Sequence, residues 1–149
     1  MLRTQTLANT ILMLSFDENI PVTPMKLQKL IYFVYKRYLK ATDNGLFYEP
    51  FEVWKYGPVL PSIYYEFNEY QSSPIKKFAR TANGKVEVVT LSQNDAVSEA
   101  ILYVWNKYKN FSGVELSKMT HEPGTAWSKA FEKHRRILED DDIKDEQEF

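Results

Sequence analysis

The chain has 149 residues, of which 44% are apolar and 26% charged, and its formal net charge is −1. This length and composition predict one globular domain over residues 1–149 and exclude a wholly disordered chain. Cysteine is absent, which excludes disulfides, thiol nucleophiles and thiolate metal sites and fits a cytoplasmic protein. No apolar stretch approaches the length of a membrane span, so no membrane partner is expected.

Charge is distributed unevenly along the chain. Residues 139–149 form an acidic C-terminal segment with seven acidic residues and one lysine, whereas the rest of the chain has 18 basic and 13 acidic residues. A basic body with an acidic end can bind an acidic partner or shield its own basic face. Ordinary solvated charge is the simpler explanation.

The first two helices are predicted from apolar spacing. Leu7, Ile11 and Leu14 share one face of a helix over about residues 3–16. Thr23 can cap a second helix that runs to about residue 41, with Pro24 at its first position. The buried stripe of this second helix is expected to be Leu27, Leu30, Ile31, Val34 and Tyr38. Its basic residues are expected on the solvated side: Lys26, Lys29, Lys36, Arg37 and Lys40.

The middle of the chain is predicted to combine extended segments with one helix. Residues 51–54 alternate as in a short strand, Gly57-Pro58 is predicted to fix a turn, and a third helix should follow over about residues 61–70. Asn83-Gly84 suits the positive φ angles of a type I′ turn. We therefore predict an antiparallel hairpin over residues 77–91.

The remaining segments are predicted to be helical. Ser92 can cap a helix over about residues 93–110, Ser112 to Glu115 has the spacing of a capping box, and Thr125 can cap a sixth helix. The residues expected to face inward from the fifth and sixth helices are Val114, Leu116, Met119, Trp127, Ala130 and Phe131. A final short helix should begin near residue 141 and dock through Ile143. The predicted fold is mainly α, a compact single-domain helical bundle of about six helices with one small β-hairpin at its edge.

The sequence contains no catalytic signature. His121 and His134 belong to no spaced ligand set, so no metal site is predicted. The five glycines are isolated, and neither a phosphate loop nor a nucleophile elbow is present. We expect no enzyme activity, no catalytic residue and no cofactor, although a small enzyme with scattered site residues stays a third alternative.

Two surfaces have alternative interpretations. The basic, aromatic second helix could contact nucleic acid, with lysines on phosphates and Tyr32 or Tyr35 stacked on bases, and helices followed by a hairpin resemble a winged helix. The small excess of positive charge favours instead aromatic residues that flank the core. Likewise, Trp54 and Tyr56 either pack under the Gly57-Pro58 corner or line a patch for a partner.

Two motifs stand out in the sequence: the Lys-Leu-x-Lys-Leu-x-Tyr pattern at residues 26–32, and Trp54-Lys55-Tyr56-Gly57-Pro58-Val59 leading to Tyr64. In combination they resemble the SocA-like antitoxin family, also called the Panacea domain and earlier labelled phage-associated GepA-like proteins. Gly124-Thr125-Ala126-Trp127 and residues 137–149 are similar to later, weaker motifs of the family. The resemblance runs from about residue 7 to the end, except over residues 71–91.

The resemblance implies a non-enzymatic antitoxin of a prokaryotic or prophage toxin–antitoxin pair, which neutralises a cognate protein toxin by direct binding. One route in the family is delivery of the toxin as a proteolytic adaptor, so a ClpXP-type protease is also implied as a partner. The alternative function is a nucleic-acid-binding regulator with a winged-helix-like hairpin. We predict that an exposed face contributes to toxin binding, formed by Lys29, Tyr32, Trp54, Tyr56 and Tyr64, with Gly57 and Pro58 as its structural corner.

Overall fold

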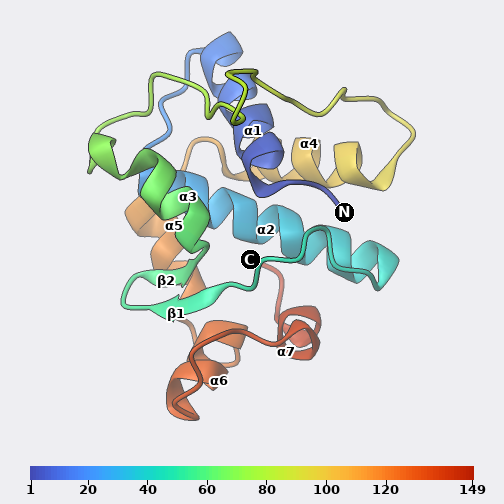
Figure 1. Cartoon of the computed structure of the whole chain (residues 1–149). Helices are drawn as coiled ribbons and strands as arrows, with labels where there is room; N and C mark the ends of the chain where they lie inside the picture. The colour runs from blue at the N-terminus through green and yellow to red at the C-terminus, as the bar shows by residue number, and fades with distance from the viewer.

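The second helix, α2 (Pro24–Thr42), is the centre of the fold. Thr23 caps it as predicted, since its side chain accepts a hydrogen bond from the Lys26 amide and Pro24 takes the first helical position. α2 packs against α1 (Thr4–Glu18), α4 (Ala96–Tyr108) and α5 (Gly113–Thr120). Figure 1 shows these and the other elements arranged around it.

The computed structural model describes the whole chain, residues 1–149, and confirms a mainly α fold. It contains seven α-helices, against the six or so expected, and one β-hairpin. The elements besides α1, α2, α4 and α5 are β1 (Glu52–Trp54), β2 (Gly57–Val59), α3 (Pro61–Phe67), the 3₁₀ turn Asn68–Tyr70, α6 (Ala126–Glu132) and α7 (Asp140–Asp145). None of the helices combines the length and the hydropathy that crossing a membrane requires.

Short polar side chains define where three of the later helices begin. Ser112 and Glu115 form the predicted capping box of α5, and Thr125 caps α6 as predicted. The cap of α4 is Asp95 rather than the predicted Ser92, whose hydroxyl donates to the Asp95 carboxylate. A carboxylate is the better cap here because its negative charge is favoured at a helix N-terminus.

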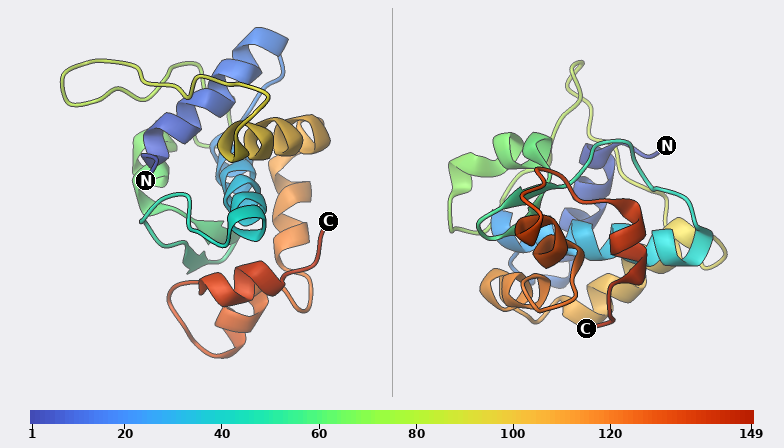
Figure 2. Two further views of the ribbon diagram at one scale, coloured as in Figure 1. Left: turned by 90° about the vertical axis from the view of Figure 1, so that its right-hand side faces the viewer. Right: turned by 90° about the horizontal axis from the view of Figure 1, so that it is seen from below.

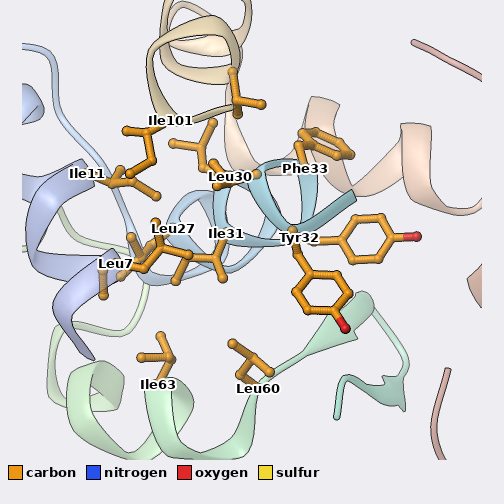
Figure 3. Packing of buried hydrophobic residues seen from close by; sticks show 14 of the residues in the cluster. Leu7, Ile11, Leu27, Leu30, Ile31, Tyr32, Phe33, Leu60, Ile63 and Ile101 are labelled. Carbon is orange, nitrogen blue, oxygen red and sulfur yellow. The ribbon is translucent and has the colours of Figure 1, made fainter. Parts of the chain in front are cut away.

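Apolar side chains from α1, α2, α3 and α4 meet in one core, whose central part is shown in Figure 3. In Figure 3, Leu27 and Ile31 of α2 lie beside Leu7 of α1 and above Ile63 of α3, and all four are at most 1% exposed. Burial of one such side chain contributes about 1.5–3 kcal/mol. The core thus forms along the apolar stripe that the sequence predicts for α2.

The β-hairpin lies at residues 52–59 and not at the predicted 77–91. Its register pairs Trp54 with Gly57, so the two-residue turn is Lys55-Tyr56, whereas Gly57-Pro58 begins β2 and does not make the turn. The other edge of β1 is covered by a bridge between Glu52 and Ile137. Both edges of β1 are therefore paired.

Residues 77–91 form an extended loop held by α1. Asn83-Gly84 makes a turn, with φ of +80° at Gly84, but the two arms do not continue as paired strands. Side chains of α1 bind the arms instead: Asn9 and Thr10 each accept a hydrogen bond from a loop amide at 2.8 Å. Figure 2 shows this loop running across α1 and projecting beyond it.

Three lysines of α2 are buried, contrary to the prediction that they lie on a solvated side. The exposed fractions of Lys26, Lys29 and Lys36 are 6%, 1% and 3%. Segments that cross α2 supply acceptors for them, such as the Lys109 carbonyl for Lys26 and the Pro58 carbonyl for Lys29. α2 is therefore buried on nearly every side.

The acidic C-terminal segment forms the predicted final helix, and this helix packs on α2. α7 begins at Asp140, and its Ile143 is 1% exposed. Beyond α7, the buried Glu146 carboxylate accepts hydrogen bonds at 2.9 Å from the Lys36 ammonium and from the Tyr32 hydroxyl. Burial lowers the pKa of Lys36, and the negative charge of Glu146 opposes that shift.

Glu146→Ala is expected to lower the free energy of unfolding by about 3–5 kcal/mol, because it leaves the buried Lys36 ammonium without its counter-charge. Glu148→Ala is the control: its carboxylate is 58% exposed and lies 3.3 Å from Lys40, so its loss should cost less than about 1 kcal/mol. Urea unfolding followed by circular dichroism measures both variants. Equal losses would contradict the prediction.

Candidate functional site

The β1–β2 hairpin is held in place by side chains from α2, α5 and α6. Four of its backbone carbonyl oxygens accept hydrogen bonds from these side chains, over 2.6–2.9 Å. The pairs are Trp127 to Trp54, His121 to Lys55, Ser117 to Tyr56 and Lys29 to Pro58. Because each bond would have to break before the turn could move, the backbone of the hairpin is rigid.

Two residues allow α2 and α5 to approach β2 closely. The buried Gln28 amide both donates to the Leu60 carbonyl and accepts from the Leu60 amide, as a neighbouring strand would. Gly57 has φ of +114°, and a Cβ there would lie 2.6 Å from Thr120 Oγ1 and 3.0 Å from Lys29 Cε. The close neighbours of Gly57 are therefore side chains of α5 and α2, Thr120 and Lys29.

The structure separates the five predicted partner-binding residues into two groups. Tyr56 and Tyr64 are 55% and 41% exposed, and the half-buried Trp54 ring lies 4.9 Å from that of Tyr64. Lys29 and Tyr32 were expected on the same exposed face, but they are 1% and 0% exposed. Tyr32 belongs to the core, and Lys29 faces the inner side of the hairpin.

Further exposed apolar side chains surround this group. Tyr65 is 69% exposed with its ring 5.4 Å from that of Tyr64, and Val114 is 57% exposed. Val114 was expected to face inward, as was Phe131, which is 59% exposed and stacks on Trp127. α5 and α6 have only eight and seven residues, too few for an apolar period to identify their buried face. We call Trp54, Tyr56, Tyr64, Tyr65 and Val114 the hairpin face.

The hairpin face has two hollows that meet at Met25 and Tyr56. An open groove of about 500 Å³ lies between Tyr56 and α5, where Val114 and Lys118 line it. A smaller pocket of about 170 Å³, the Lys29 pocket, lies on the other side of Tyr56. Its lining residues are Pro24, Met25, Gln28, Lys29, Trp54, Tyr56, Val59, Ile63, Tyr64 and Gln71.

Lys29 is the charged group of this smaller pocket. Burial lowers its pKa to about 7, and its ammonium donates to the Pro58 carbonyl at 2.9 Å. No cluster of three or more histidine or carboxylate side chains that could hold a metal ion forms in the protein. The chemistry available on this face is therefore that of aromatic rings around one buried amine.

Gly57→Ala is expected to cost at least about 2 kcal/mol of stability, because the Cβ meets Thr120 in addition to the strain of a positive φ. Gly84→Ala is the matched control: its φ is +80° but a Cβ would meet no atom within 4 Å, so the cost should be about 1 kcal/mol. Thermal unfolding compares them. Similar losses would show that the close approach at Gly57 does not matter.

Lys29→Met is expected to change how stability depends on pH. The pKa of Lys29 is about 7 in the folded chain and about 10.4 in the unfolded chain, so between these values the folded chain holds fewer protons. Lys29 therefore destabilises the wild type most below about pH 7, and its cost falls as pH rises.

The stability of Lys29→Met relative to the wild type should thus fall by on the order of 2 kcal/mol between about pH 6 and about pH 9. Urea unfolding at both pH values measures this change. Lys55→Met, at an exposed position of the same hairpin, should show no such change. A difference for Lys29→Met that is independent of pH would refute the assignment.

Comparisons with known proteins identify the family of this chain. Residues 27–128, which include the hairpin, match the family described as antitoxin SocA-like, Panacea domain. Over 125 residues the chain is 30% identical to the antitoxin SocA of Caulobacter vibrioides (strain NA1000 / CB15N), across 80% of this chain and 65% of that protein. The chain thus spans just under two thirds of the length of this relative. No solved structure matches the chain. The chain belongs to the SocA-like antitoxin family of Panacea domains.

Proposed function

We propose that this chain is an antitoxin that neutralises a cognate toxin protein by binding it directly through the hairpin face. Membership of the SocA-like family supports the antitoxin role. The observation that most supports direct binding is the exposure of Tyr56 on a hairpin whose backbone is already rigid, with the exposed Tyr64 of α3 beside the Trp54 ring. Aromatic anchors on a pre-organised backbone lose little conformational entropy on binding.

The geometry of the groove supports a binding role over an enzymatic one. Ser117 and His121 both line the groove, yet they do not form a nucleophile–base pair. The Ser117 hydroxyl donates to the Tyr56 carbonyl at 2.6 Å, and both ring nitrogens of His121 face carbonyl oxygens, those of Ser117 and Lys55. These side chains hold the hairpin, and the hydroxyl nearest His121, that of Thr120 at 3.4 Å, donates to the Ser117 carbonyl.

The burial of the α2 lysines weakens the case for nucleic acid as the partner. Lys26, Lys29 and Lys36 donate to groups inside the protein and form no exposed basic surface along which a phosphate backbone could lie. The predicted hairpin at residues 77–91, which suggested a winged helix, is an unpaired loop. Both features on which the nucleic-acid interpretation rested are therefore lost.

Tyr56→Ala is expected to weaken binding to the toxin, which is to be sought among the products of the neighbouring reading frames, by about thirtyfold or more, because an interface anchor of this type contributes about 2 kcal/mol. Tyr48→Ala is the control, since Tyr48 is 83% exposed and lies outside both hollows of the hairpin face. It should change the affinity by less than about threefold. Calorimetry with purified toxin and rescue of growth on co-expression measure the effects.

A folded Tyr56→Ala variant that binds and rescues like the wild type would place the binding surface elsewhere. The same strains distinguish two routes of neutralisation by immunoblot. A toxin that is blocked keeps its abundance, whereas delivery to a ClpXP-type protease lowers it in proportion to the antitoxin. Lack of toxicity in the neighbouring frames, with no binding partner among them, would contradict the antitoxin role itself.

A further inference from the structure

Lys29 differs from the other buried lysines in how its ammonium group is satisfied. A lysine ammonium has three N–H donors. Lys36 donates to both the Glu146 carboxylate and the Gln147 carbonyl, and Lys26 donates to two carbonyls. Lys29 makes a single hydrogen bond, to the Pro58 carbonyl, and no ion pair. It is thus a buried cation with two donors unused and no counter-charge.

The pocket beside Lys29 contains no negatively charged side chain that could pair with the Lys29 ammonium. No aspartate or glutamate lines it, and its walls are mainly apolar or aromatic side chains and two amides. The pocket holds about 170 Å³, well below the roughly 300 Å³ at which small-molecule sites begin, so it suits one side chain. An anion that reaches the Lys29 ammonium gains a charge-assisted hydrogen bond with a group that is itself only 1% exposed, where electrostatic attraction is stronger than in water.

We infer that the Lys29 pocket binds a carboxylate side chain of the protein partner, an Asp or Glu flanked by aromatic residues, which enters beside Trp54, Tyr56 and Tyr64 and pairs with the Lys29 ammonium. This inference rests on the proposed function, since it takes the partner to be a protein. The aromatic neighbours of the acid would lie against the rings of the hairpin face. The partner is thereby described by its chemistry: an acidic side chain within an apolar patch.

Other charged groups near the pocket do not provide this pairing. The Glu52 carboxylate accepts from the Trp54 indole at 2.9 Å, and the Lys55 ammonium lies 5.5 Å from the centre of the Tyr56 ring, in an exposed turn. His121 binds the Lys55 carbonyl on the side of the groove. Tyr56 and Tyr64 are the titratable groups that line the pocket with Lys29. Lys29 is thus the cation that a bound carboxylate meets inside the pocket.

The test uses two peptides that differ only in charge, acetyl-Phe-Glu-Phe-amide and acetyl-Phe-Gln-Phe-amide, titrated into the ¹⁵N-labelled full chain. At about pH 6 the Glu peptide should bind about tenfold more tightly, the value of one charge-assisted hydrogen bond, and shift the Trp54 indole signal. This preference should disappear in Lys29→Met and persist in Lys55→Met. In the wild type it should decline towards about pH 9, as Lys29 loses its proton.

Equal binding of the two peptides, no binding of either, or a preference that persists in Lys29→Met would overturn the inference. The pH series on the wild type decides the matter if Lys29→Met does not fold. Free 3-phenylpropanoate is a third probe: if it binds more tightly than the Glu peptide, the pocket is a site for small acids and the inference is wrong. Because no toxin is present, failure here leaves the rescue by the antitoxin to be judged separately.

Discussion

A helix buried on nearly all sides must have its polar side chains bonded within the protein, and this constraint on α2 determines where the remaining segments lie. Lys26 binds the end of α4, Gln28 and Lys29 bind β2 and its exit, and Lys36 binds the C-terminal segment. No buried side-chain polar atom lacks a hydrogen-bond partner. Apolar burial supplies most of the stabilisation, and these polar bonds select one arrangement.

The same constraint explains how a short hairpin becomes a surface for recognition. Two strands of three residues are marginal on their own. Here the donors from α2, α5 and α6 hold the turn, so that Tyr56 stands between the groove and the Lys29 pocket. The buried Lys29 lowers the stability of the folded chain at neutral and lower pH. Proteins keep such destabilising charged groups at functional sites, for example where a charged ligand binds.

Much of the fold could be predicted from the sequence because the helices begin at recognisable caps and carry clear apolar periods, as α2 does from Thr23 onward. The hairpin was misplaced because the turn signal at Asn83-Gly84 is local, whereas pairing of its arms was decided by Asn9 on α1. The exposed aromatics of the site could be predicted in part: Tyr56 and Tyr64 were identified as exposed. Lys29 was wrongly predicted to be exposed. The sequence around a lysine does not show that a distant segment, here the carbonyl of Pro58, will bury it and accept its hydrogen bond.

The distance along the chain between Lys36 and Glu146 has a consequence for kinetics. The two residues are 110 positions apart, so their bond closes a loop that spans most of the chain. The entropy of loop closure makes such contacts late events in folding. A contact that forms after the transition state slows unfolding while leaving the folding rate nearly unchanged. We therefore expect the C-terminal segment to act chiefly on the lifetime of the native state, the property that determines how long a chain resists irreversible unfolding.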